Sequence, residues 1–372
     1  MVRGNNALDD YLKTKVAAKG TEHTHTRIGS KELKLPGGSY VIQLDEQNEF
    51  LDKYYQSVWG LGNLEYLTEK QLISNGPLLV DIDLRYLPDI SKRQHCDEHV
   101  LDAIVLYADK IANLYDIQEN QSIDVYVLQK KNVNRLDSVT KDGIHIIFGI
   151  QIHKAIQCLL RREVLVDLPE MWDDLPITNK WTDVLDEGIS KGCVNWQLYG
   201  SRKPGNEAYT LHQHYTLSRS SNDWEASQHS IDSVSIREIL PKLSARYTDW
   251  PAFDAVEERK EEYNSEIANF QTGQKKRKLV VHVNKDISAS NVDPIQYIAL
   301  MRAGQSPNIN EKILDEMISE LYSDSDVCDY AFKETHQYTM CLPDTYYGPG
   351  SFTNWIRVGW ALANSAKINP SH

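Results

Sequence analysis

Two acidic residues, Asp81 and Asp83, stand two positions apart in a run that otherwise has the composition of a buried strand. Side chains alternate along a strand, so both carboxylates share one face with Arg85, while the opposite face carries Val80, Ile82 and Leu84. Burying two unpaired like charges is unfavourable unless a cation compensates them. The spacing therefore predicts either a divalent metal ion or an accessible cleft edge at this strand.

Two later segments add chemistry to this pair. His145 enters a strongly apolar strand, four residues after Lys141. Asp186 is followed thirteen residues later by Tyr199, in the run Asn195-Trp-Gln-Leu-Tyr-Gly-Ser-Arg-Lys203. The three segments together predict one site assembled from distant parts of the chain.

The three segments resemble the motifs of the archaeo-eukaryotic primase superfamily, and specifically the primase part of the primase-helicases of large DNA viruses. The matches are the Asp81/Asp83 pair, Gly143-Ile-His145, and Asp186 with Tyr199-Gly-Ser-Arg-Lys203. Gly143 stands where serine is commoner. The resemblance covers roughly residues 20–215, and residues 351–362 resemble the helical module that follows the primase domain in this family.

The resemblance implies an α+β primase catalytic domain with an RNA-recognition-like antiparallel sheet, followed by a small C-terminal helical module. It implies template-directed synthesis of short RNA or DNA primers by a DNA-directed nucleotidyltransferase. The partners would be a single-stranded DNA template and nucleoside triphosphates. Asp81, Asp83 and Asp186 would hold Mg²⁺ or Mn²⁺, which prefer oxygen ligands and assist phosphoryl transfer.

Four further residues receive roles as nucleotide ligands. The resemblance implies that His145 donates a hydrogen bond to the triphosphate of the incoming nucleotide. The cationic side chains of Lys141, Arg202 and Lys203 are suited to phosphate.

Each motif also has a structural interpretation when it is taken alone. Asp81 and Asp83 could be solvated acids of an edge strand, and His145 could be a core histidine. Asp186 has other acidic residues nearby, so its selection depends on its offset from Tyr199. The resemblance favours the functional interpretation because the motifs occur together and in order.

The elements around these residues are predicted from periodicity and turn residues. Helical spacing indicates helices near residues 46–59, 97–115 and 153–165. Strands rich in Val and Ile are expected at 123–129 and 143–152. Further helices are predicted at 294–302, 310–322 and 353–365.

The composition suggests three parts. We predict a catalytic domain over residues 1–255, a charged linker over 256–291, where the Lys275-Lys-Arg-Lys278 cluster lies, and a partial helical module over 292–372. The apolar stripe of the last helix needs a partner, so we expect the natural polypeptide to continue. No GxxxxGK[ST] phosphate loop occurs, so any helicase domain is expected beyond His372.

The whole chain has 372 residues and a net charge of −13, which argues against a protein that coats nucleic acid but is compatible with a local basic channel. The five cysteines show no CxxC spacing, and the first thirty residues contain no secretory signal. We expect an intracellular protein with no membrane span, in the host cytoplasm or nucleus if it is viral.

Two other classes of function stay open at this stage. A metal-dependent nuclease would use the same carboxylates with a lysine or histidine that activates water. A catalytically idle nucleic-acid-binding module could instead recruit a helicase. Neither would need contacts to a triphosphate.

Overall fold

The computed structural model describes residues 6–220, 223–232, 234–277, 339, 341–346 and 358. The chain divides into two compact units, Met1–Gln274 and Lys275–His372. The first unit contains the elements discussed below. The described part of the second unit includes the single 3-10 turn η4 (Asp344–Tyr346).

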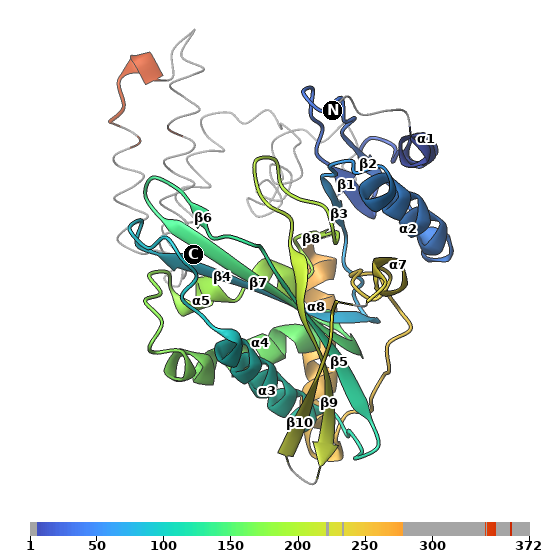
Figure 1. The fold of residues 1–372 in the computed structure, drawn as a ribbon. Helices are drawn as coiled ribbons and strands as arrows, with labels where there is room; N and C mark the ends of the chain where they lie inside the picture. The colour runs from blue at the N-terminus through green and yellow to red at the C-terminus, as the bar shows by residue number, and fades with distance from the viewer. Residues whose placement is uncertain are drawn as a thin grey trace, which may run out of the picture. The chain divides into compact units, whose positions relative to one another are not determined.

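The centre of the first unit is a six-stranded antiparallel sheet (Figure 1). Its strands follow the order β10-β9-β5-β7-β4, and the short β6 pairs with β7. The bounds are β4 Gly76–Tyr86, β5 Ser122–Gln129, β6 Asn134–Arg135, β7 Thr140–Ile152, β9 Thr210–Ser220 and β10 Asp223–His229. The strands predicted at 123–129 and 143–152 are therefore present as β5 and β7.

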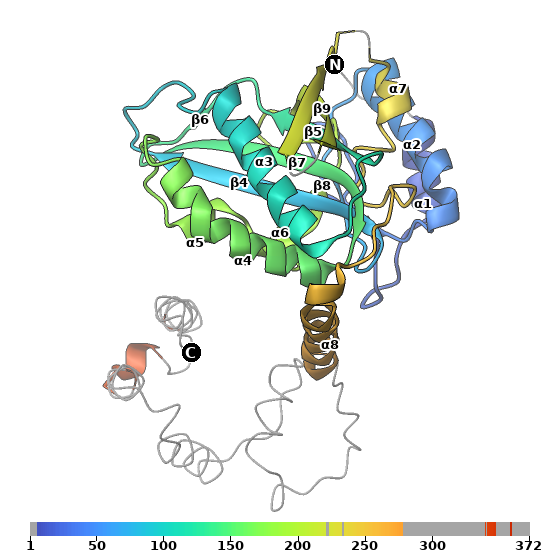
Figure 2. The same ribbon diagram turned by 90° about the horizontal axis from the view of Figure 1, so that it is seen from below.

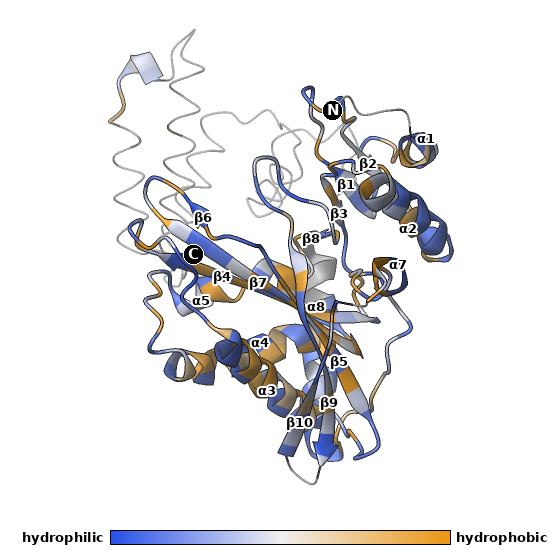
Figure 3. Cartoon of the chain, in the orientation of Figure 1, coloured by the Kyte–Doolittle hydropathy of each residue, from blue (hydrophilic) through white to orange (hydrophobic). Residues whose placement is uncertain are grey.

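Two long helices, α3 (Asp97–Leu114) and α4 (Lys154–Met171), cover one face of this sheet and contact each other (Figure 2). Their apolar sides carry much of the hydrophobic colouring in Figure 3. They pack on the even-numbered side chains of β4 and β7, which form one buried core with them. The α4 helix runs past its predicted end at residue 165 and includes Pro169, which has no N–H to donate to the Leu165 carbonyl.

The opposite face of the sheet packs on a second core. This core includes Leu79 of β4, Leu128 of β5 and Ile147 of β7, together with residues from the N-terminal helices and a smaller sheet. The smaller sheet has the order β2-β1-β3-β8. Its strands and the neighbouring helices are β1 His25–Arg27, β2 Gly38–Tyr40, β3 Leu67–Glu69, β8 Trp196–Gln197, α1 Ala7–Thr14, α2 Gln47–Tyr55 and α7 Ile236–Ile239.

The helix predicted at 46–59 is divided in the structure. A 3-10 turn, η1 (Leu44–Glu46), leads into α2, and the chain then widens into the π-helical turn η2 (Gln56–Gly60). Two four-residue helices, α5 (Trp181–Val184) and α6 (Glu187–Ser190), lie next to β4. They complete the elements that surround the acidic residues.

The chain after residue 255 continues as the turn η3 (Glu257–Arg259) and helix α8 (Lys260–Arg277). Tyr263 and Ile267 of α8 pack against the core formed by the sheet with α3 and α4. The described part of the predicted linker is thus helical and contacts the core. The helices predicted at 294–302, 310–322 and 353–365 lie outside the described residues, apart from residue 358.

The mixed α+β class with antiparallel sheets is confirmed. Among the helices of the described residues, none combines the length and the apolar character needed to cross a lipid bilayer.

Candidate metal and nucleotide site

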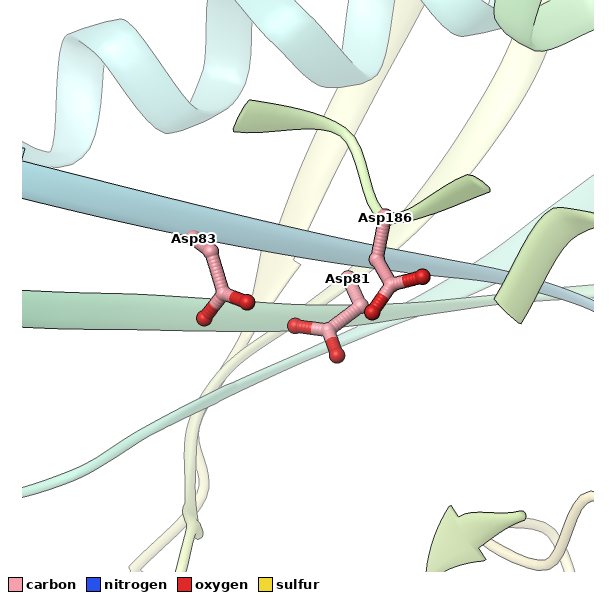
Figure 4. Close-up of side chains that lie close together, drawn as sticks. All are labelled: Asp81, Asp83 and Asp186. Carbon is pink, nitrogen blue, oxygen red and sulfur yellow. The ribbon is translucent and has the colours of Figure 1, made fainter. Parts of the chain in front are cut away.

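Three carboxylates meet beside β4 (Figure 4). Asp81 and Asp83 extend from the strand, and Asp186 immediately precedes α6. One carboxylate oxygen from each residue lies within 4.8 Å of the other two. The structure thus brings together the three residues that the sequence selected as metal ligands.

Backbone contacts hold Asp186 against the strand. Its N–H donates to the Asp81 carbonyl at 2.9 Å, and Leu185 forms an isolated β-bridge with Ile82. The Asp186 Oδ1 atom accepts a hydrogen bond from the Ile189 N–H at 3.1 Å, so the side chain also caps α6. Asp186 therefore reaches the site as part of a short strand-like segment that ends in a helix cap.

A buried arginine on α4 fixes the segment that precedes Asp186. Arg161 donates from Nε to the Leu185 carbonyl at 2.9 Å and from a terminal nitrogen to the Thr182 carbonyl at 2.7 Å. The residue is only 7% exposed. Arg161 was not among the residues predicted from the sequence, although an arginine in the apolar pattern of that helix was a possible signal.

The carboxylates destabilise one another as anions. Burial raises the pKa of Asp81 well above its usual range, and Asp83 and Asp186 raise it further, against the lowering effect of nearby lysines. Asp83 is more exposed, yet loss of water around its carboxyl, followed by Asp186, raises its pKa too. The nearby lysines therefore do not fully compensate the negative charge of the cluster.

The donor set fits a hard divalent cation. The Asp81 Oδ1 atom is buried and has no hydrogen-bond partner among the described residues. An orphaned carboxylate oxygen beside two more carboxylates is a favourable ligand set for Mg²⁺ or Mn²⁺. Asp81, Asp83 and Asp186 are the residues that would hold such an ion.

His145 lies opposite Asp81 in the antiparallel register of β4 and β7. Its Nε2 atom is 3.5 Å from Asp81 Oδ1. Its ring stacks on Tyr209, with the centroids 3.6 Å apart, and also contacts Trp196. Burial lowers the pKa of His145 well below 6.5, and Lys130 and Lys203 lower it further, so the ring is neutral at neutral pH.

Two lysines supply positive charge near the carboxylates. Lys203, which was predicted to bind phosphate, is exposed, and its positive charge acts to lower the pKa of both acidic residues of β4. Lys130 directly follows β5, and its Nζ atom lies 4.7 Å from the centroid of the Tyr209 ring. Burial, then Lys203, lowers the pKa of Lys130, whereas Asp83 and Asp81 raise it. Lys130 and Tyr209 were both missed, since neither belongs to a recognised motif.

The other two predicted nucleotide ligands lie at the edges of the site. Lys141 pairs with Arg85 in the β4–β7 register, further along the face that carries Asp83. Arg202 donates its backbone N–H to the Glu65 carbonyl at 3.0 Å, and its Nε atom is buried without a partner among the described residues. Nucleotide binding by these side chains stays a prediction.

An open cleft of about 540 Å³ adjoins the carboxylates. Asp83 and Asp186 line it on one side, and Arg85 and Arg161 add positive charge. The remaining lining residues are Thr182, Asp183, Glu187 and Gly188. The cleft gives solvent and a polar ligand access to the acidic cluster.

The family described as the N-terminal AEP domain of the C962R protein, where AEP denotes archaeo-eukaryotic primase, matches residues 30–215. The chain belongs to this family. The resemblance to the primase superfamily is therefore confirmed, and the matched region contains the acidic cluster and His145. No curated protein matches the chain.

Proposed function

We propose that this chain is a DNA primase that makes short RNA or DNA primers from nucleoside triphosphates on a single-stranded DNA template, as the N-terminal part of a viral replicative primase-helicase. The observation that carries the proposal is the convergence of Asp81, Asp83 and Asp186 opposite His145, inside an AEP domain. We infer further that the six-stranded sheet is the RNA-recognition-like sheet of the primase fold.

The proposed chemistry is phosphoryl transfer. Bound Mg²⁺ or Mn²⁺ would supply charge neutralisation at the phosphates and activation of the attacking 3′-hydroxyl. The three aspartates would hold the ions. Lys130 and Lys203 would attract the triphosphate to the carboxylate face, because their charges offset an otherwise negative site.

His145 would act as a neutral hydrogen-bond donor. A neutral imidazole has one N–H group, and stacking on Tyr209 fixes the plane in which that group lies. The ring can therefore donate a hydrogen bond that orients a phosphate oxygen, without transferring its proton. This role supports positioning of the nucleotide rather than proton transfer.

The proposal is tested by incorporation of labelled nucleoside triphosphates on unprimed single-stranded DNA with Mg²⁺ or Mn²⁺. The parent chain is compared with Asp81→Asn/Asp83→Asn, which keeps the side-chain volumes and removes two charges. The matched control is Asp89→Asn/Asp137→Asn, which removes two exposed carboxylates elsewhere. We expect short products from the parent and the control, and none from the first variant.

The alternative classes give other outcomes. Cleavage of a labelled strand without added nucleotides, lost in Asp81→Asn/Asp83→Asn, would identify a nuclease. Strand binding without incorporation by the parent protein would identify a recruitment module. Either result would overturn the primase proposal.

A further inference from the structure

Position 143 has no room for a side chain. Gly143 lies opposite Asp83 in the β4–β7 register and two residues before His145. A Cβ atom at this position would lie 2.4 Å from the hydroxyl oxygen of Tyr209, closer than such contacts occur in proteins. The Tyr209 hydroxyl thus occupies the space above the strand that a side chain at 143 would fill.

The tyrosine ring is held from more than one side. It stacks on His145 with an interplanar angle of 19°, and the Lys130 ammonium lies over the ring. Tyr209 is 8% exposed. The ring therefore has little freedom, and the place of its hydroxyl is set by packing.

The hydroxyl lies close enough to the acidic residues of β4 to feel their charge. Burial, followed by Asp81 and Asp83, raises the pKa of Tyr209 well above its usual range. The group is therefore a protonated donor at neutral pH. Such a donor, fixed at the edge of a charged site, is suited to an anionic oxygen of a ligand.

Serine is the commoner residue at this position of the resembling motif, and serine would bring a hydroxyl from the strand itself. Here a glycine and a tyrosine together place a hydroxyl over the same point, from the start of β9. We propose that the Tyr209 hydroxyl takes over this place and donates a hydrogen bond to a phosphate oxygen of the nucleoside triphosphate bound beside the carboxylates. The inference rests on the proposed function, because it assumes that this face binds the nucleotide.

The test exchanges the hydroxyl between the two positions. Tyr209→Phe removes the hydroxyl and keeps the ring, and Gly143→Ser forces a clash with the tyrosine. In Tyr209→Phe/Gly143→Ser the clash is absent, because the ring carbon Cζ would be 3.5 Å from the new Cβ, and a hydroxyl returns from the strand. Binding of a nucleoside triphosphate with Mg²⁺, without template, is measured by calorimetry, and KM and kcat are measured in primer synthesis.

We expect Tyr209→Phe to weaken nucleotide binding and raise KM about tenfold, with a smaller change in kcat. Gly143→Ser should weaken binding at least as much. The double variant should bind within about threefold of the parent, so that the two changes are strongly non-additive. Thermal unfolding of each variant separates loss of a contact from loss of fold.

The matched control is Tyr86→Phe. Its hydroxyl is buried without a partner among the described residues, on the opposite face of β4, so its removal should leave nucleotide binding unchanged. Parent-like binding and KM in Tyr209→Phe would overturn the inference, as would a double variant no better than the worse single one. A parent that neither binds nucleotide nor makes primers would instead refute the proposed function, and the inference with it.

Discussion

Asp186 combines two tasks that substitution can separate. Its Oδ1 atom caps α6, and its charge contributes to the acidic cluster. Asp186→Asn keeps an oxygen for the cap and removes the charge, so we expect unchanged or slightly higher stability without metal, together with loss of the rise in melting temperature that Mg²⁺ or Mn²⁺ gives the parent. Thermal unfolding with and without the ion measures both effects.

Asp186→Ala is the companion variant. It removes cap and charge together, and the lost cap should lower the free energy of unfolding by about 1 kcal/mol relative to Asp186→Asn. A full response of Asp186→Asn to the metal would show that this carboxylate is no ligand.

The residues of the site differ in how well the sequence could predict them. Asp81 and Asp83 share a face because strand alternation is a local property, and the structure agrees. Lys130 and Tyr209 come from the end of β5 and the start of β9. They approach His145 only through the strand order β9-β5-β7, which no local pattern contains.

Helix α4 reaches the acidic cluster through Arg161. Arg161→Lys cannot donate to the Leu185 and Thr182 carbonyls with the same fork, so we expect unfolding to become easier by about 1–3 kcal/mol. Because the segment before Asp186 loosens, the Mg²⁺ concentration for half-maximal thermal stabilisation should also rise. Calorimetric scans over a series of Mg²⁺ concentrations measure this change.

Arg162→Lys is the matched control, since the next side chain of α4 is exposed and pairs with Glu266 of α8. It should leave the Mg²⁺ response unchanged. Equal Mg²⁺ responses of the two variants would contradict a positioning role for Arg161.

Strand β3 is tied to the segment at 244–246 by a buried carboxyl. Glu69 accepts hydrogen bonds at 2.7 Å from the Ser244 hydroxyl and from the Ala245 N–H, yet burial raises its pKa to about 7. Between its ordinary pKa, near 4.5, and about 7, the folded state keeps a proton that the unfolded state has lost. This contribution to stability is complete below pH 4.5 and is lost as the pH rises through 7.

Glu69→Gln cannot ionise, and its amide can still form hydrogen bonds with Ser244 and Ala245. We expect it to match the parent near pH 4.5 and to exceed its free energy of unfolding by roughly 2–3 kcal/mol at pH 8.5. Urea unfolding at the two pH values measures the difference. Glu32→Gln, which changes an exposed residue, is the control and should show no such pH dependence. If Glu69→Gln differed from the parent in free energy of unfolding by the same amount at both pH values, ionisation of Glu69 would not be the cause.

The first folded unit includes most of α8 and ends at Gln274, beyond the boundary that the composition suggested at residue 255. The charge blocks of that region indicated an exposed connector, because charge alternation does not reveal which few apolar residues face a core. Tyr263 meets the Tyr115 ring edge-on at 5.7 Å, Phe270 meets His153, and Arg259 pairs with Glu163. These contacts join η3 and α8 to the C-terminal end of α3 and to α4.

A fragment of residues 1–277 should therefore be more stable than one of residues 1–255, by about 2–3 kcal/mol in chemical denaturation. In the full chain, Tyr263→Ala should destabilise the same transition, and Asn264→Ala on the exposed side of α8 should not. Equal stability of the two fragments would place the end of the folded unit at 255.

The pairing of β4 with β7 places the residues of the site and the residues of the helix-covered core on opposite faces of the two strands. Asp81, Asp83, Gly143 and His145 are all odd, and the apolar residues between them face the helices. A slip of one residue in this ladder would exchange the two sets and drive the carboxylates under α3 and α4. A change of length in the exposed turn at residues 118–120, between α3 and β5, would leave this ladder in register. A single insertion within β4 or β7 would instead destroy both the site and the core.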